Sequence, residues 1–243
     1  MTRSGATLLV SDLHLAPDTA AVTERFFSFL SGPATHARRL IILGDLFDAW
    51  AGDDDLSDPF NQHITGALKA LSQRGVTIEF MCGNRDFLVG NDFAEAAGLT
   101  LLPDPCVRDI AGTRTLLTHG DLLCSDDNDY QQFRATVRTP EWRAAFLGLP
   151  LAERKRQIAA LRQRSESEKQ IKSMAIMDVN DAAVRAAFSN HHVDTIIHGH
   201  THRQQQHNQM ISGTQHTRWV LGDWTPDTGQ ALTCSPAGWH FTT

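Results

Sequence analysis

The chain has 243 residues, of which 41% are hydrophobic, so it can bury a substantial core as one domain that carries an insertion. Its formal net charge of −6 argues against a general nucleic-acid-binding protein, because such proteins usually carry a basic excess. The N-terminus lacks the apolar core of a signal peptide, no apolar run approaches the roughly 20 residues of a membrane-spanning helix, and the cysteines form no C-x-x-C pair. We expect a cytosolic protein that can still contact a membrane surface.

Five short apolar segments, each a predicted strand, are followed at once by Asp, Asn or His, usually beside glycine. In chain order the polar segments are Ser11–His14 after "TLLV", Gly44–Asp48 after "LIIL", Cys82–Asp86 after "TIEFM", Thr118–Asp121 after "TLL" and His198–His202 after "TII". Helices are predicted at Ala20–Leu30 and Pro59–Gln73, the second ended by Gly75. Strands that alternate with helices predict a layered α/β fold, whose ligands bind beyond the carboxyl ends of the strands.

The stretch "HGHTHR" contains three histidines at alternate positions, His198, His200 and His202. If the preceding strand continues through them, its period of two places all three imidazoles on one face. Neutral imidazole is the commonest metal ligand in proteins, whereas a polar strand end that faces solvent explains the same pattern without a metal. This stretch alone leaves both interpretations open.

Seven side chains at the ends of the five strands are candidate metal ligands: Asp12, His14, Asp45, Asn84, His119, His200 and His202. Taken singly, an Asp can cap a helix, Asn84 can occupy a turn and His119 can fill the core. Five such sites in order, each behind its own strand, favour metal binding instead. Seven oxygen and nitrogen ligands without a thiolate suit two divalent ions, which a central carboxylate could bridge for phosphoryl chemistry.

The ordered motifs "DLH" at Asp12–His14, "GD" at Gly44–Asp45, "GN" at Gly83–Asn84, "HGD" at His119–Asp121 and "GHTH" at Gly199–His202 resemble those of the calcineurin-like metallophosphoesterases. The resemblance implies an α/β fold, a four-layer αββα sandwich with an inserted helical lid, and a centre of two metal ions. It implies that one ion is held by Asp12, His14, Asp45 and His202, and the other by Asp45, Asn84, His119 and His200. His198 matches no ligand position, so we expect it to pack or to orient its neighbours.

One departure from the superfamily is Arg85, which stands where many members have a histidine that can act as a general acid. Arginine stays charged at physiological pH, so we expect Arg85 to bind phosphate oxygens and to donate no proton in catalysis. The alternative is a surface arginine after a turn. A diphosphate ester, whose leaving group is a phosphate, needs little help from an acid.

The segment Leu122–Val179 has helix signals and no strong strand signal, and we interpret it as a helical lid inserted into a single domain that spans residues 1–243. Within it, residues 151–172 carry seven basic side chains against three acidic ones. This excess indicates a phosphate-rich substrate or an anionic membrane surface, or else a solvated helix face. The apolar side chains of Trp142, Phe146 and Leu149 fit either helix packing or contact with acyl chains. We expect a short Gly/Ser loop in place of the lid to leave metal binding intact.

Four segments carry a closer resemblance, to the UDP-2,3-diacylglucosamine diphosphatases of lipid A biosynthesis: "GNRD", His119–Asp127, "ALRQRS" at Ala160–Ser165 and Lys172–Asn180. It implies that a UDP-linked diacylated glucosamine is cleaved at its pyrophosphate, giving UMP and the acylated sugar 1-phosphate. The implied substrate contacts are Asn84, Arg85, Asp127, Ser165, Lys169, Lys172 and His200, although Lys169 replaces the Asn expected there.

The same resemblance implies two divalent ions, with Mn²⁺ as the expected metal, and a peripheral position at the cytoplasmic face of the inner membrane. No side chain is assigned as the nucleophile, because two cations can activate a bridging water. We expect neither nucleic acid nor an obligate protein as a partner. The alternatives are a metallophosphoesterase for another nucleotide or phosphodiester, a scaffold without activity, and a membrane-surface binding module.

Overall fold

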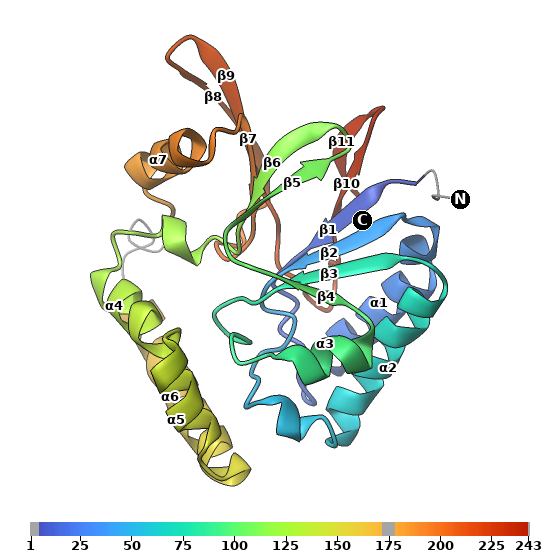
Figure 1. Cartoon of the computed structure of the whole chain (residues 1–243), viewed down its shortest axis with the longest axis vertical. Helices are drawn as coiled ribbons and strands as arrows, with labels where there is room; N and C mark the ends of the chain where they lie inside the picture. The colour runs from blue at the N-terminus through green and yellow to red at the C-terminus, as the bar shows by residue number, and fades with distance from the viewer. Residues whose placement is uncertain (1–4, 172–177, 243) are drawn as a thin grey trace.

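The computed structural model describes the backbone of residues 5–171 and 178–242, and the side chains of these residues except 165–171. Two β-sheets lie face to face, and helices cover their outer sides (Figure 1). The layers run from α1 (Ala20–Ser31), α2 (Pro59–Gln73) and α3 (Asn91–Ala97), through the two sheets, to α7 (Asp181–His191). The predicted four-layer αββα sandwich is confirmed.

The six-stranded sheet contains the first three of the predicted strands. Its order is β11 (Gly238–Thr242), β10 (Ala231–Ser235), β1 (Thr7–Val10), β2 (Arg39–Leu43), β3 (Thr77–Met81) and β4 (Thr100–Leu102). Strands β1 to β4 are parallel, and Thr7 pairs with Arg39, which in turn pairs with Thr77. This register brings the carboxyl ends of β1, β2 and β3 to one edge of the sheet, where ligands bind in such folds.

The five-stranded sheet contains the other two predicted strands. Its order is β5 (Cys106–Ile110), β6 (Thr113–Leu117), β7 (Thr195–His198), β9 (Thr214–Val220) and β8 (Gln205–Ile211). Because β6 and β7 are parallel, the residues that follow them also meet at one edge. The tail after His202 adds β8 to β11.

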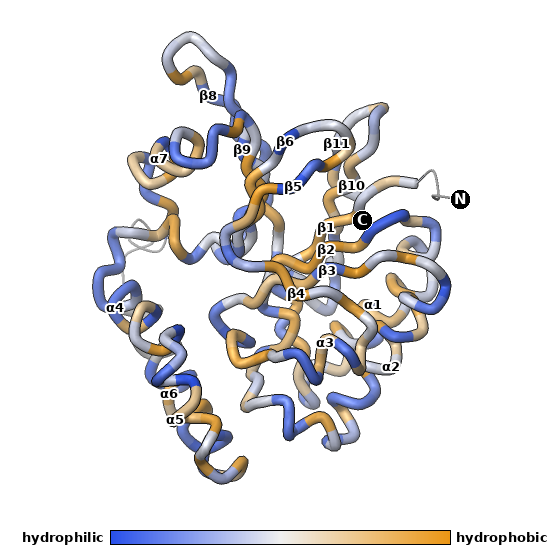
Figure 2. The backbone as a smooth tube through the Cα atoms, viewed as in Figure 1, coloured by the Kyte–Doolittle hydropathy of each residue, from blue (hydrophilic) through white to orange (hydrophobic). Residues whose placement is uncertain are grey.

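Alternate residues of the strands pack into different layers of the core. On β1 and β2, Leu9 and Ile41 face the space between the sheets, while Val10 and Ile42 pack with α1 to α3. A third cluster, which includes Phe188, joins α7 to the five-stranded sheet. Figure 2 shows hydrophobic residues along the central strands. The buried strands hold the loops at their ends on a rigid base.

The predicted ends of α2 are confirmed. Pro59 occupies the first turn, and the Asp58 side chain caps the helix by accepting a hydrogen bond from Phe60 N at 2.9 Å. Gly75 follows with φ of 87°, a left-handed conformation that glycine adopts without steric cost.

The segment between β6 and α7 consists of helices joined by turns and loops, and its described residues include no strand. It contains η3 (Asp121–Leu123), α4 (Asn128–Val137), α5 (Pro140–Leu147) and α6 (Leu151–Ile171). Two further short helices, η1 (Pro33–His36) and η2 (Asp53–Asp55), lie earlier in the chain. The two ends of the segment between β6 and α7 meet, because Asn180 N donates a hydrogen bond to Leu123 O at 2.8 Å. Among the described residues, no helix has both the length and the apolar character to cross a membrane.

Two side chains of this segment support the packing interpretation over an acyl-chain surface. The rings of Trp142 and Phe146 stack with centroids 4.6 Å apart, and Phe146 is only 6% exposed within the main core cluster. Phe146 therefore cannot contact an acyl chain without moving.

Acidic residues in and around η2 partly neutralise the excess positive charge of residues 151–172. Arg154 is 2% exposed and bonds to the Asp54 carboxylate and to Ala51 O. Lys155 Nζ lies 2.7 Å from Asp55 Oδ1. These ion pairs fix α6 to the loop around η2. The prediction that the basic side chains of α6 serve a phosphate or a membrane surface was therefore wrong for Arg154.

Candidate metal centre

The seven predicted ligands gather where the five predicted strands end. Asn84 Oδ1 lies 2.9 Å from both His119 Nε2 and His200 Nδ1, so residues from β3, β6 and β7 meet at one atom. On the other side, His202 Nε2 lies 3.4 Å from Asp12 Oδ1 and 3.4 Å from His14 Nε2.

Asp45 stands between these two groups. Its Oδ2 lies 3.9 Å from His14 Nδ1, and its Oδ1 lies 3.8 Å from His119 Nε2. Among the described His, Cys, Asp and Glu residues, two sets have potential ligand atoms within 4.8 Å of one another: Asp12, His14 and His202, and Asp12, Asp45 and His119. The division expected from the resemblance is compatible with this geometry, with Asp45 next to both groups.

The donor atoms fit divalent cations. Asp12 Oδ1 and His14 Nδ1 are buried, and neither has a hydrogen-bond partner. Buried polar atoms are nearly always satisfied, so two such orphans in one cluster indicate a missing partner, and a cation would satisfy both. Carboxylate, amide and imidazole donors without a thiolate suit Mn²⁺, Mg²⁺ or Zn²⁺ better than softer ions.

The charges of the cluster also point to a cation. Burial lowers the pKa of His14 to about 3 and that of His200 to about 3, which keeps both imidazoles neutral and able to bind a metal. Burial raises the pKa of Asp45 to about 7, and the neighbouring carboxylates of Asp86 and Asp12 add to this effect. Burial opposes the charge of His202 as well, but the carboxylates of Asp12, 3.4 Å from its Nε2, and Asp223, 3.5 Å from its Nδ1, raise its pKa to about 10. Metal binding would therefore displace protons.

The backbone is strained at five of the seven predicted ligands. Positive φ angles occur at Asp12 (55°), His14 (49°), Asp45 (53°), His200 (69°) and His202 (58°). Residues other than glycine rarely adopt this region, at a cost of order 1–3 kcal/mol each, and such strain clusters at functional sites. This observation is independent of the side-chain distances and supports the same site.

Two glycines allow the ligand loops to pack this closely. A Cβ atom at Gly83 would clash with the Asp45 carboxylate, and one at Gly199 would clash with Asp12 Oδ2. The glycines noticed beside the polar residues in the sequence thus make room for carboxylates from neighbouring loops.

His198 occupies a different place from the one its spacing predicts. Strand β7 ends at His198, and the positive φ angles at His200 and His202 end the alternation, so the three histidines do not share a strand face. His198 is fully buried, and its Nε2 accepts a hydrogen bond from Arg218 Nη1 at 3.0 Å. The prediction of a shared face was wrong, but the expectation that His198 packs beside the ligands is confirmed.

Asp86 is a further site residue, the last of the "GNRD" motif, and the sequence alone gave it no role. Its Oδ1 accepts hydrogen bonds from Gly83 N at 2.7 Å and Asp45 N at 3.3 Å, and its Oδ2 accepts from Leu46 N at 2.8 Å and Phe47 N at 3.3 Å. The buried carboxylate thereby joins the loop of Asn84 to that of Asp45. Asp223, 3.5 Å from His202 Nδ1, was also missed and lies in the "VLGDW" stretch.

The predicted substrate contacts other than Asn84 and His200 are less fully described. Arg85 is half-buried beside the ligands, and its N donates to Asp45 Oδ1 at 2.8 Å. Asp127 caps α4 by accepting a hydrogen bond from Tyr130 N at 3.2 Å. Ser165 and Lys169 lie on α6 with side chains outside the described part, and Lys172 lies outside the described residues altogether.

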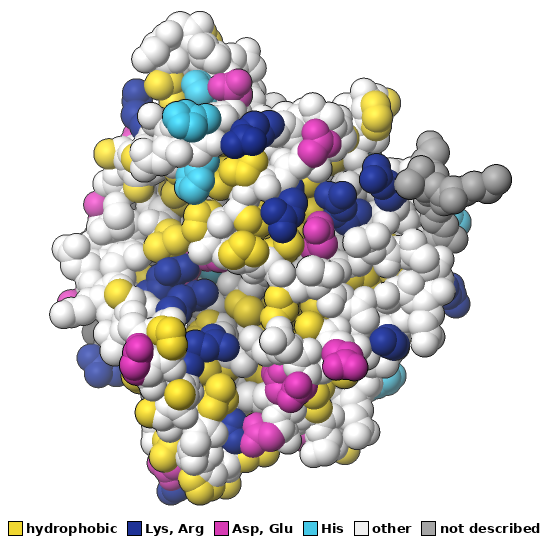
Figure 3. Space-filling model, viewed as in Figure 1, with side chains coloured by type: hydrophobic (Ala, Val, Ile, Leu, Met, Phe, Trp, Pro, Cys, Tyr) yellow, Lys and Arg dark blue, Asp and Glu magenta, His cyan; other side chains and the backbone are white. Residues whose placement is uncertain are grey.

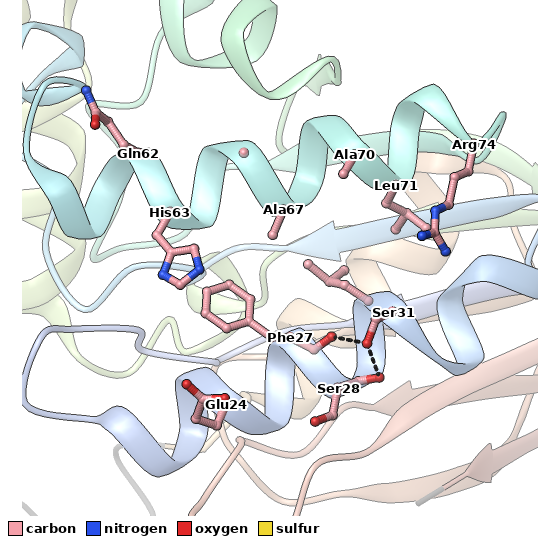
Figure 4. A pocket seen from close by; sticks show the side chains of 12 residues that line it. Glu24, Phe27, Ser28, Ser31, Gln62, His63, Ala67, Ala70, Leu71 and Arg74 are labelled. Atoms are coloured by element: carbon pink, nitrogen blue, oxygen red, sulfur yellow. Dashed lines mark hydrogen bonds between the residues drawn. The ribbon is translucent and has the colours of Figure 1, made fainter.

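A separate groove lies between α1 and α2, in the outer helical layer (Figure 4). It has a volume of about 540 Å³, and Phe27, His63 and Arg74 are among the residues that line it. None of the seven predicted ligands lines this groove.

The sequence model of the calcineurin-like phosphoesterase family matches residues 6–204. The chain belongs to this family. The UDP-2,3-diacylglucosamine hydrolase of Aromatoleum aromaticum is 49% identical over 220 residues, which cover 90% of this chain and 89% of that protein. The proteins of the same name from Stenotrophomonas maltophilia (47% identical over 244 residues, 98% of each chain) and Escherichia coli (48% over 219 residues, 90% of this chain and 91% of that one) are similar as well. Both resemblances seen in the sequence are confirmed.

Proposed function

We propose that this protein hydrolyses the pyrophosphate bond of UDP-2,3-diacylglucosamine, releasing UMP and 2,3-diacylglucosamine 1-phosphate in lipid A biosynthesis. The observation that carries the proposal is the convergence of all seven predicted ligands, from the ends of five strands in two sheets, on one partly buried cluster. The names of relatives that are 47–49% identical over nearly the whole chain support the substrate.

Asp12, His14, Asp45 and His202 would hold one cation, and Asp45, Asn84, His119 and His200 the other, with Mn²⁺ as the proposed metal. Such a pair, when bound, supplies Lewis-acid charge and an activated water for attack on phosphorus. Arg85 sits beside the cluster, and its guanidinium would bind the phosphate oxygens and stabilise charge that builds on them. Asp86 holds the Asp45 and Asn84 loops in register before substrate arrives.

The inserted segment 122–179 would act as the lid of the single domain and recognise the acylated sugar. Asp127, Ser165, Lys169 and Lys172 are its proposed substrate contacts. Because the substrate is a lipid, we propose that the protein works as a peripheral protein at the cytoplasmic face of the inner membrane, without nucleic acid or an obligate protein partner.

The proposal is tested by comparing three substrates on the full chain: UDP-2,3-diacylglucosamine, an unacylated UDP-glucosamine and bis(p-nitrophenyl) phosphate. We expect UMP release from the acylated substrate only when a divalent ion is added, with Mn²⁺ more effective than Mg²⁺ or Zn²⁺. Binding of about four methylenes at about 0.8 kcal/mol each would raise kcat/KM over the unacylated sugar by roughly 200-fold.

Equal kcat/KM for the acylated and unacylated sugars would refute the lipid substrate and leave a phosphoesterase for another nucleotide or phosphodiester. The membrane position is tested separately. In lysates, the protein should sediment with inner membranes at low salt and be released at high salt, because surface charge attraction is screened. Recovery in the soluble fraction under both conditions would refute it.

A further inference from the structure

Arg134, on the first helix of the inserted segment, spans two carboxylates of the core. Its Nε donates to Asp121 Oδ2 at 2.7 Å, and its Nη2 donates to Asp104 Oδ2 at 3.0 Å. The Asp121 side chain is 0% exposed, that of Asp104 4% and that of Arg134 12%. A guanidinium can make two such directed bonds at once because its donors form a planar fork.

Both carboxylates belong to the surroundings of the ligand His119. Asp121 follows His119 by two residues on the same loop. Asp104 Oδ1 accepts hydrogen bonds from Thr118 Oγ1 at 2.7 Å and from His119 N at 3.2 Å. Arg134 therefore fixes the loop of His119 from two directions.

Tyr130, one turn earlier on α4, connects the same network to a second ligand. Its hydroxyl donates to Asp121 Oδ2 at 2.6 Å. Its ring stacks against that of His200, with centroids 6.1 Å apart and planes inclined by 26°. Tyr130 thus limits the orientations that the His200 ring can take.

Arg138, one turn after Arg134, contacts the loop that carries the third ligand, Asn84. Its Nη2 donates to Gly83 O at 2.8 Å, directly before Asn84, while Arg143 of α5 bonds to Phe87 O on the same loop. Figure 3 shows Lys and Arg side chains gathered where the inserted helices meet the core. The contacts of α4 therefore reach the loops of Asn84, His119 and His200, the three residues that share the Asn84 Oδ1 contacts.

We propose that Arg134 and Tyr130 are positioning residues for the metal ion held by Asn84, His119 and His200, so that the inserted segment completes the metal centre as well as covering it. The inference rests on the metal site of the proposed function. It reverses the expectation that a Gly/Ser loop in place of residues 122–179 leaves metal binding intact, because that change removes Arg134 and Tyr130, which both bond to the Asp121 carboxylate. Partners of metal ligands typically contribute 10–100-fold to metal affinity.

The test measures Mn²⁺ binding to the metal-stripped full chain by titration calorimetry and by electron paramagnetic resonance, which distinguishes a coupled Mn²⁺ pair from single ions. In Arg134→Met we expect one of the two Mn²⁺ ions to bind about 10–100-fold more weakly, with loss of the coupled-pair signal at two equivalents. Arg134→Lys keeps the charge but cannot span both carboxylates, and Tyr130→Phe keeps the ring but loses the hydroxyl. Both should weaken the same ion to a smaller extent, and both keep the test open if Arg134→Met does not fold.

Arg154→Met is the matched control, because Arg154 is a second buried arginine of the inserted segment that bonds to Asp54, in the loop around η2. This variant should melt at a lower temperature and bind both Mn²⁺ ions with wild-type affinity. Wild-type affinity for both ions in Arg134→Lys and Tyr130→Phe would overturn the inference, as would equal weakening in Arg154→Met. Because Mn²⁺ binding is measured without substrate, failure of the lipid substrate in the turnover assay leaves this result interpretable.

Discussion

Replacement of Asp86 by Asn perturbs the connection between two ligand loops without changing the size of the side chain. The carboxylate accepts four backbone hydrogen bonds, two at each oxygen, and the amide that replaces it has one oxygen and one NH₂ group. Two of the four backbone N–H groups then face the NH₂ group of the new side chain and lose their hydrogen-bond acceptor. One of these lost bonds is short, 2.7 or 2.8 Å, and the other is long, 3.3 Å.

A bond to a buried charge contributes about 1.5–3 kcal/mol, and the longer bond about 1 kcal/mol, so Asp86→Asn should lower the free energy of unfolding by about 3 kcal/mol. At roughly 2–4 °C per kcal/mol for a chain of this size, Tm should fall by about 6–12 °C. Thermal unfolding is measured in a chelator, because bound metal would stabilise the folded state. The same variant should bind Mn²⁺ more weakly, since Asp45 and Asn84 lose their common support.

Asp53→Asn is the matched control, because the Asp53 carboxylate likewise accepts several hydrogen bonds, three in all, from Trp50 Nε1, Gly90 N and Phe93 N, each at 3.0 Å. It should lose stability while keeping its Mn²⁺ affinity. A loss of less than about 1 kcal/mol in Asp86→Asn would refute the reasoning from the four bonds. Equal loss of metal affinity in both variants would show that Asp86 has no special connection to the ligands.

Asp45→Asn should reduce turnover by at least about 100-fold and remove the coupled-pair signal of Mn²⁺, with a smaller effect on the melting temperature, because a shared ligand is lost. Arg85→Ala should reduce kcat/KM by roughly 10–100-fold, the loss of a charged hydrogen bond, and Mn²⁺ titration should show unchanged binding. The hydrogen bond from Arg154 lowers the pKa of Asp54 from 3.8, so its stabilisation exists above that value and disappears as the pH falls below it. The stability difference between wild type and Arg154→Met should therefore shrink as the pH falls below about 4. In metal-free protein, His14→Asn should raise Tm by a few degrees.

The ligands could be predicted from the sequence because all seven lie just after the ends of five predicted strands. A buried apolar run, a glycine and a polar residue are a local pattern, and parallel strands bring their ends together wherever the chain runs between them. Asp12, which follows β1, and His119, which follows β6, could therefore be predicted although these two strands lie in different sheets.

The supporting residues could not be predicted in the same way, because their function depends on contacts between distant segments. Arg134 resembles any basic residue of a helix until its bonds to Asp104 and Asp121 are seen. Arg154 was read as part of a basic surface, but its partner Asp54 lies 100 positions earlier in the chain. The histidine spacing was misread because a period of two assumes extended backbone, whereas the chain turns at His200.

His14 shows why a ligand can be a source of instability in the metal-free protein. Its φ is 49°, and its Nδ1 is buried without a partner. Each of these features costs free energy that a bound cation would offset, the backbone strain alone about 1 kcal/mol or more. The fold holds His14 in this conformation through the hydrogen bond from its N to Asp45 O at 2.9 Å, which Asn can also make.

His14→Asn should therefore melt later than wild type in a chelator and earlier than wild type in saturating Mn²⁺, since Asn adopts positive φ more readily but lacks the imidazole. His192→Asn separates the two contributions, because His192 has φ of 51° as the C-cap of α7, away from the ligands. His192→Asn should melt later than wild type both in the chelator and in saturating Mn²⁺, because it relieves backbone strain without removing a metal ligand. If His14→Asn melted below wild type even in the chelator, the imidazole would be stabilising the empty cluster, and the positive φ angles at the ligands would not represent strain that metal binding offsets.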